Sequence, residues 1–195
     1  MASLRHGRPG RKLFTMLLVL CLLATIRHPE PAVPFLSWDA CPFECCAYGR
    51  WTATKTVTVR SRRSETAPVA FTVHRGETVA ATTGVVVTTV LGIVRATRPL
   101  TLGESRIRVA VPRGDRFYIL HYQGEGTYVF WYQGRKYSDA RYITPTSRAP
   151  VIVPASGVEL LRAPEWSWWI KVKNQRGQSG WILGNRGFDG SDSCS

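Results

Sequence analysis

The stretch RGDRFYILHYQGEGTYVFWYQGR, residues 113–135, decides the fold class. It contains two runs rich in aromatic and aliphatic side chains, residues 117–122 and 128–132, with a Gly-Glu-Gly turn at residues 124–126 between them. Short runs of this composition, bounded by glycine-containing turns, are typical of β-strands joined in hairpins. We therefore predict a pair of antiparallel strands at the centre of the chain.

The same pattern of short strands and turns extends to both sides. No run after residue 45 has the sustained 3.6-residue periodicity of an amphipathic helix. Many short strands with Gly-rich turns predict an all-β protein built as a small barrel or sandwich. The further predicted strands cover residues 51–60, 69–74, 79–83, 85–91, 107–111, 151–153, 158–162, 168–173 and 180–183.

Composition narrows the class of protein. The chain has 195 residues, of which 44% are hydrophobic and 20% charged, close to globular averages. These values exclude a wholly disordered chain and a collagen-like one. Since the sequence has a single long apolar run, it is also not a multi-pass membrane protein.

The first 34 residues are predicted to be an export signal and a linker. Four basic residues between positions 5 and 12 precede an uncharged run over residues 13–26, which is too short to cross a bilayer. We expect a signal helix that is cleaved after Ala24 or kept as an anchor, and no integral membrane domain once it is removed. The net charge of +13 then falls to +9, because residues 1–24 carry four positive charges.

Cysteine usage agrees with export to the periplasm or the extracellular space. Cys41, Cys45, Cys46 and Cys194 remain after the signal, an even number that allows two disulfides. Neighbouring cysteines in an extended segment point to opposite sides, so we predict that Cys194 bonds to Cys45 or Cys46 and that Cys41 takes another cysteine of its group. The spacing matches no zinc site, and we predict neither a metal nor a cofactor.

A linker-like composition at residues 144–150 suggests a domain boundary. We predict a first domain over residues 35–145, which includes the cysteine-rich motif, and a smaller unit over residues 146–195. About 45 residues form only a marginal core alone, so the small unit should pack on the larger one.

Two stretches resemble bacterial SH3-type modules. The sequence WWIKVK at residues 168–173, followed by GQSGWI at residues 177–182, resembles the second half of an SH3-type barrel. Residues 71–79 resemble the strand, Gly-Asp/Glu turn and strand of the same modules. The resemblance implies two small SH3-like barrels packed together.

The chain from residue 41 to residue 194 also resembles a group of uncharacterised bacterial secreted proteins. The likeness rests on CPFECC at residues 41–46, the Tyr-x-x-Trp motif at residues 48–51, the segment at residues 114–126, and a cysteine near the C-terminus. It implies fold and compartment, and it carries no known activity.

Aromatic and basic side chains are the candidate binding residues. Tyr132, Trp166 and Trp168 would form an exposed aromatic shelf for a sugar or peptide; the alternative is that these aromatics fill the cores. A basic group would attract an anionic cell-wall polymer or lipid headgroups, the alternative being a solvated face. Its members are Arg50, Lys55, Arg60, Arg62 and Arg63.

We expect an exported, non-catalytic SH3-like binding or structural module at the cell envelope. The expected partners are a cell-wall polymer such as peptidoglycan or an envelope protein, and nucleic acid is not expected. The competing hypothesis is a secreted thiol-dependent enzyme in which His121 acts as a base for Cys45 or Cys46. The oligomeric state does not follow from the sequence.

Overall fold

A computed structural model describes residues 29–104, 106–144 and 151–194. These ranges contain β-strands and no α-helix, so the all-β prediction is confirmed. They accordingly hold no helix with the length and apolar character needed to cross a membrane. The expected signal helix lies outside the described residues.

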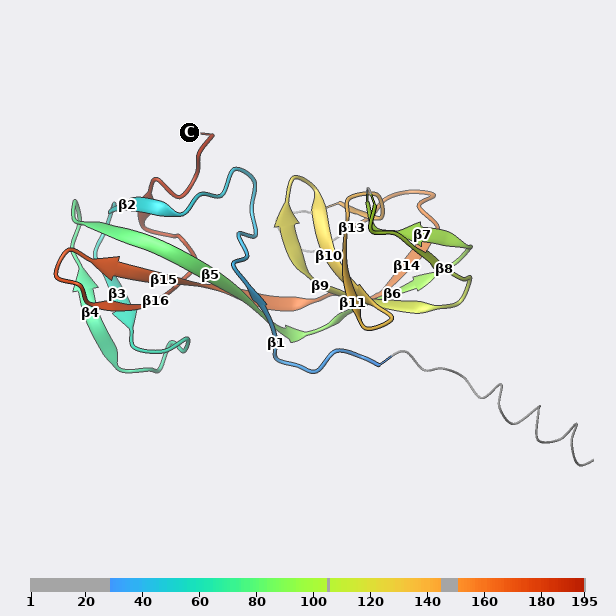
Figure 1. Cartoon of the computed structure of the whole chain (residues 1–195), viewed down its shortest axis with the longest axis horizontal. Helices are drawn as coiled ribbons and strands as arrows, with labels where there is room; N and C mark the ends of the chain where they lie inside the picture. The colour runs from blue at the N-terminus through green and yellow to red at the C-terminus, as the bar shows by residue number, and fades with distance from the viewer. Residues whose placement is uncertain (1–28, 105, 145–150, 195) are drawn as a thin grey trace, which may run out of the picture.

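The strands form two main sheets. Figure 1 shows two lobes side by side along the long axis, with β5 and β15 extending from one towards the other. The eight-stranded sheet has the order β17 (Phe188–Asp189), β2 (Gly49–Ala53), β5 (Thr78–Val90), β15 (Glu165–Asn174), β16 (Ser179–Leu183), β3 (Val57–Arg60) and β4 (Val69–Val73), with β1 (Phe35–Trp38) paired to β5. The five-stranded sheet has the order β11 (Arg135–Asp139), β10 (Thr127–Tyr132), β9 (Arg116–Gly124), β6 (Gly92–Ala96) and β14 (Val158–Arg162). Two hairpins complete the fold, β7 (Leu100–Leu102) with β8 (Val109–Val111) and β12 (Ile143–Thr144) with β13 (Val151–Ile152).

Strand pairing divides the chain into a discontinuous first unit and an inserted second unit. The first unit takes residues 35–90 and 165–194, and the second takes residues 91–163. Both contain the same order: β17–β2–β5–β15–β16 in the first and β14–β6–β9–β10–β11 in the second. Each also has a hairpin at the corresponding place in the chain, β3–β4 between β2 and β5, and β7–β8 between β6 and β9. In the chain, the second unit therefore stands in place of the loop between β5 and β15 of the first unit.

The repeat extends to individual hydrogen bonds. In each unit an alanine at the end of a strand exchanges two backbone hydrogen bonds with an Arg-Gly-acid turn, and the following threonine donates to a glycine carbonyl. The pairs are Ala53 with Gly76 and Glu77, Ala96 with Gly114 and Asp115, Thr54 with Gly187, and Thr97 with Gly157.

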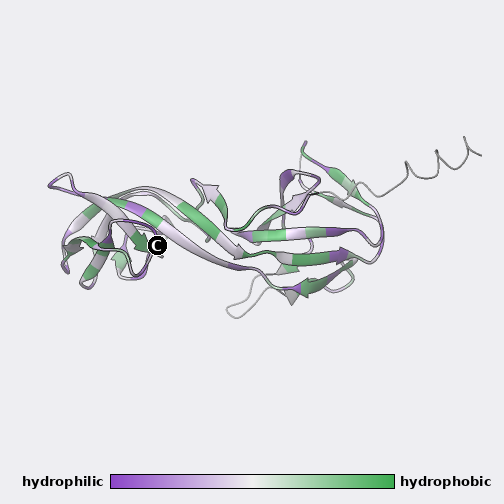
Figure 2. Ribbon diagram, turned by 90° about the horizontal axis from the view of Figure 1, so that it is seen from below, coloured by the Kyte–Doolittle hydropathy of each residue, from purple (hydrophilic) through white to green (hydrophobic). Residues whose placement is uncertain are grey.

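Each unit encloses its own apolar core. Alternate residues of β15 point into the first core, which gathers around Trp51, Trp168 and Ile170, all at most 6% exposed. The second core gathers around Phe117 and Phe130, which are fully buried. In Figure 2 the hydrophobic positions recur along the strands of both lobes. Two cores of this kind explain the high aromatic content of the chain.

The pairing does not follow the predicted boundary at residue 145. Strand β14 joins the second unit, whereas β15, β16 and β17 return to the first. A linker-like composition marks a break in local structure, but it carries no information on which strand pairs with which. Most of the predicted linker, residues 145–150, lies outside the described residues.

Several predicted strands have different bounds in the structure. The predicted strand at 51–60 is divided into β2 and β3, and the predicted strands at 79–83 and 85–91 are continuous as β5, through Gly84. A Cβ at position 84 would collide with the Tyr48 hydroxyl and with Trp168 Nε1. Gly84 is therefore a point of close approach and not a strand end.

An N-terminal strap, residues 29–41, crosses from the second unit to the first. The Trp131 indole donates to the Pro29 carbonyl at 3.1 Å, and Pro31 is buried. Residues 29–34 therefore belong to the folded part of the chain, contrary to the prediction that everything up to residue 34 lies outside it. Proline-rich composition suggested a free linker, but an extended proline segment also packs well on aromatic rings.

Two disulfides fix the strap and the C-terminus. Cys41 bonds to Cys46 and Cys45 bonds to Cys194, with Cα–Cα distances of 5.7 Å and 5.5 Å. The predicted pairing is confirmed, and Cys45 is the partner of Cys194. Backbone hydrogen bonding supports this closure, because Ser193 N–H donates to the Cys45 carbonyl at 2.8 Å.

Loss of the long-range disulfide should be the more destabilising of the two losses. The Cys45–Cys194 bond has a sequence separation of 149, against 5 for Cys41–Cys46. Chain entropy then predicts a loss of about 5 kcal/mol for Cys194→Ser and about 2 kcal/mol for the double variant Cys41→Ser/Cys46→Ser. Urea unfolding of both variants measures the difference, and equal losses would contradict this account.

Candidate functional site

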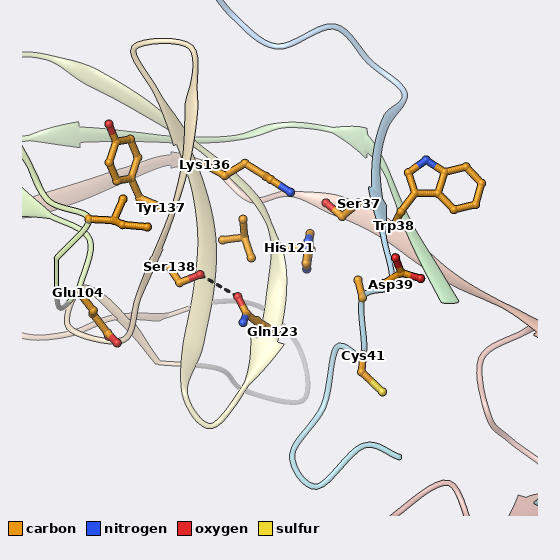
Figure 3. Close-up of a pocket in the computed structure, with 13 residues that line it drawn as sticks. Ser37, Trp38, Asp39, Cys41, Glu104, His121, Gln123, Lys136, Tyr137 and Ser138 are labelled. Atoms are coloured by element: carbon orange, nitrogen blue, oxygen red, sulfur yellow. Dashed lines mark hydrogen bonds between the residues drawn. The ribbon is translucent and has the colours of Figure 1, made fainter. Parts of the chain in front are cut away.

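A cavity of about 500 Å³ lies between the two units. One wall is the strap at residues 37–41, and the other is formed by β9, β10 and β11. Glu104 and Ile107, from the turn between β7 and β8, line one end (Figure 3). Since the walls come from both units, the cavity exists only when the strap lies across the second unit.

Ser37 from the strap wall faces His121 and Lys136 from the opposite wall of this interunit cavity. Their side chains point towards the same space in Figure 3. Ser37 is 4% exposed and its hydroxyl has no hydrogen-bond partner among the described residues. A buried hydroxyl without a partner costs free energy, which a polar ligand group in the cavity would offset.

The buried imidazole of His121 is neutral. Its ring is 2% exposed, and burial lowers the pKa of His121 to about 4, with the nearby Lys136 charge acting in the same direction. The Nδ1 atom lies 2.6 Å from the Tyr122 carbonyl, so in the neutral ring Nδ1 carries the proton and donates it. Nε2 is then a hydrogen-bond acceptor.

Further polar groups of β9, β11 and the β7–β8 turn line the cavity. The Ser138 hydroxyl donates to Gln123 Oε1 at 2.8 Å, which leaves the Gln123 amide N–H groups as donors. Glu104 accepts from the backbone N–H of Ala140 at 3.0 Å. The cavity therefore presents donors and acceptors together with charges of both signs, as a site for a small polar ligand requires.

The predicted aromatic shelf is not assembled. Tyr132 is 2% exposed, and its hydroxyl donates to Asp115 at 2.6 Å; burial and this bond raise the pKa of Tyr132 to about 12. Trp168 is 6% exposed and donates to the Ala40 carbonyl. Trp166 is half-buried, with its ring 6.5 Å from that of His121. Tyr132 and Trp168 fill different cores, which is the alternative that the sequence left open.

The predicted basic group is spread over several elements of the first unit. Arg50 lies on β2 and Arg60 on β3, while Lys55, Arg62 and Arg63 lie in the adjoining turns. Arg63 is the most constrained of them, since its guanidinium lies 4.8 Å from the centre of the Trp38 ring and 5.2 Å from that of Trp181.

The cysteines offer no thiolate among the described residues. Cys45, Cys194 and Asp192 lie close enough together to suggest a metal site, but both sulfurs are in the same disulfide. Cys41 lines the interunit cavity, bonded to Cys46. The pairing of His121 with a reactive Cys45 or Cys46 is therefore not assembled.

Sequence reasoning missed Ser37, Gln123 and Lys136. None of them belongs to a recognisable motif, and their proximity arises from the insertion of one unit into the other. Among the cavity's hydrogen-bonding side chains, the sequence pointed only to His121, and it predicted a different role, as a base for a cysteine thiol.

No protein-family model, no curated protein and no solved structure matches this chain.

Stability should fall in acid because of His121. The pKa of His121 drops from 6.5 in the unfolded chain to about 4 on folding, so the unfolded state binds the proton first as the pH falls. The stability that folding gains from a neutral His121 is fully present above about pH 6.5 and is lost by about pH 4. The free energy of unfolding should fall by about 3 kcal/mol over this range because of His121.

Melting curves between pH 7 and pH 4 test this prediction. His121→Gln should show a shallower loss of melting temperature over that range than the wild type. His74→Gln, at an exposed position, is the matched control and should follow the wild type. Parallel curves for His121→Gln and the wild type would contradict the assignment.

Proposed function

We propose that this protein is an exported, non-catalytic module of two SH3-like units that binds a component of the bacterial cell envelope. The interunit cavity carries the proposal, because it combines a buried, unpartnered Ser37 hydroxyl with donors and acceptors from both units. A short polar segment of a cell-wall polymer such as peptidoglycan, or of an envelope protein, would satisfy these groups.

The SH3-like description rests on sequence and topology together. Residues 168–182 carry the Trp-rich strand and the Gly-x-x-Gly-Trp segment of the resemblance, and they form β15 and β16. The same five-strand order occurs in both units, which supports two copies of one small barrel type. We extend this proposal to membership of the resembling group of bacterial secreted proteins.

Export is supported by the disulfides and by the order of the N-terminal residues. Two disulfides are compatible with an oxidising compartment. We propose that the basic and apolar segment before residue 27 directs the chain to the periplasm or to the cell exterior. N-terminal sequencing of the exported protein would test this; a protein that stays in the cytosol with Met1 retained would overturn it.

The competing thiol-enzyme hypothesis has less support. It needs a free thiolate beside an imidazole, whereas the four described cysteines are paired with one another. Titration of thiols in the exported protein distinguishes the two hypotheses. A reactive thiol at Cys45 or Cys46 would favour the enzyme.

A sedimentation assay with purified peptidoglycan tests the binding function. We expect the wild type to sediment with the polymer at low salt and to be released in part at high salt, because exposed charges are screened over about 8 Å at physiological strength. Lys136→Gln should weaken binding several-fold, since it removes a cation from the cavity wall.

Arg135→Gln is the matched control, because Arg135 is exposed on the same strand and does not line the cavity. If the wild type stays in the supernatant at both salt concentrations, peptidoglycan is not the ligand. If Arg135→Gln and Lys136→Gln weaken binding equally, the cavity is not the binding site.

A further inference from the structure

The first sheet has an outer face, on the side opposite its core, that strand register defines residue by residue. Trp168, Ile170 and Val172 of β15 point into the core, so Trp169, Lys171 and Lys173 belong to the outer face. Cross-strand partners lie on the same face of a sheet, which allows the rest of the face to be assigned from the pairing.

Three neighbouring rows make up this outer face. The first runs Leu183–Trp169–Val85–Trp38 and the second Val69–Arg60–Trp181–Lys171–Thr83, across β16, β15 and β5 in both cases. The third row runs Ser179–Lys173–Ala80–Arg50.

Exposed apolar side chains gather on the outer face. Trp38, Val69 and Leu183 are 54%, 55% and 43% exposed, and they account for half of the six large hydrophobic side chains that are exposed in the described part of the chain. The centre of the first row is covered, since Val85 and Trp169 are at most 6% exposed. The apolar groups therefore lie around the rim of a buried centre, where they can reach a partner.

Cations alternate with these apolar groups. Lys171, Lys173 and Arg50 are exposed, and Arg60 lies beside Trp181 in the second row. The Arg63 guanidinium lies against the rings of both Trp38 and Trp181, at 4.8 Å and 5.2 Å from their centres, and its Nη1 atom is buried. Cation–π contact with two indoles holds this positive charge in place beside Trp38.

Acidic groups near the face are fewer. Asp39 follows Trp38 on the strap and accepts a hydrogen bond from Thr83. Glu65 shares a small recess with Arg60 and Arg186. By the same register Asp189, the partner of Thr52 on β2, also lies on this face. With five cations against these three acids, the face carries a net positive charge and suits an anionic partner.

We propose that the outer face of the first sheet is a docking surface for an anionic phospholipid membrane. Trp38, Leu183 and Val69 would enter the headgroup region, and the exposed Lys171 and Lys173 would contact lipid phosphates. A soluble polyanion would use the cations alone, whereas the exposed apolar side chains between them need an apolar phase. This membrane site meets the interunit cavity at Trp38, whereas Leu183, Val69, Lys171 and Lys173 lie outside the cavity, and the site goes beyond the envelope-binding function proposed above.

Vesicle sedimentation with the full exported chain tests the proposal. The vesicles contain equal amounts of phosphatidylglycerol and phosphatidylcholine, and pure phosphatidylcholine vesicles are the neutral reference. We expect binding to the anionic vesicles and a blue shift of tryptophan fluorescence as exposed Trp38 leaves water. Equal binding to both kinds of vesicle would overturn the proposal.

Two double variants separate the charged and apolar contributions. Lys171→Gln/Lys173→Gln should weaken binding about 30-fold, since each basic residue at an anionic surface contributes about a fivefold change. Leu183→Ser/Val69→Ser should weaken binding to vesicles and leave binding to soluble polyphosphate unchanged. A melting curve for each variant confirms that it is folded before it is compared.

The matched control is Arg113→Gln/Arg135→Gln, which removes two exposed cations from the second unit. It should bind vesicles like the wild type; an equal loss would mean that net charge alone drives binding, and the proposed face would be wrong. If the Leu183→Ser/Val69→Ser variant binds vesicles like the wild type, the face recognises polyanions and not lipid. Peptidoglycan sedimentation of Lys171→Gln/Lys173→Gln should match the wild type, so the two sites can fail independently.

Discussion

The pairing of β5 with β15 holds the molecule together. Ten residues of β15, Glu165–Asn174, pair with β5 although the whole second unit lies between the two strands in the sequence. This ladder begins inside the first unit and ends where the second one starts, so it sets the position of each unit relative to the other. Backbone hydrogen bonds in a long antiparallel ladder are satisfied only in one register, which makes the connection specific as well as strong.

Gly84, near the middle of that ladder, allows the strap to be attached. With no Cβ there, the Ala40 carbonyl comes close to β5 and accepts hydrogen bonds from the Tyr48 hydroxyl at 2.6 Å and from Trp168 Nε1 at 2.9 Å. A glycine in a strand interior often marks such a close approach of another backbone segment. The Cys41–Cys46 disulfide follows immediately, so the strap is held by hydrogen bonds and by a covalent bond at neighbouring positions. The interunit cavity depends on this attachment, because the strap forms one of its walls.

Local signals in the sequence predicted many of the strands and the cysteine arrangement. Residues 158–162 become β14 with the predicted bounds, and the number and spacing of the cysteines indicated that Cys194 bonds to Cys45 or Cys46, of which the structure selects Cys45. The insertion could not be predicted in this way, because strand composition does not say that β15 pairs with a strand 75 residues earlier in the chain. The prediction of the binding residues was wrong for the same reason, because composition does not show which face of a strand a side chain occupies. Trp168 looked like a ligand-binding residue but faces the core, whereas Trp38, which drew no attention, is exposed beside Trp181.

The two units repeat one strand order, yet their outer faces differ in what covers them. On the second unit, the strap lies over the outer face, where Phe35 packs against Trp131 and the Trp131 indole bonds to Pro29. On the first unit, the centre of the outer face is also buried, with Arg63 against Trp38 and Trp181, but Trp38 and Leu183 at its rim stay exposed. A repeated fold gives both faces similar geometry, so the difference comes from the strap and from the side chains. Since the strap covers the apolar side chains of the second unit's outer face, whereas those at the rim of the first unit's outer face stay exposed among cations, the rim of the first unit is the surface available to a partner from outside.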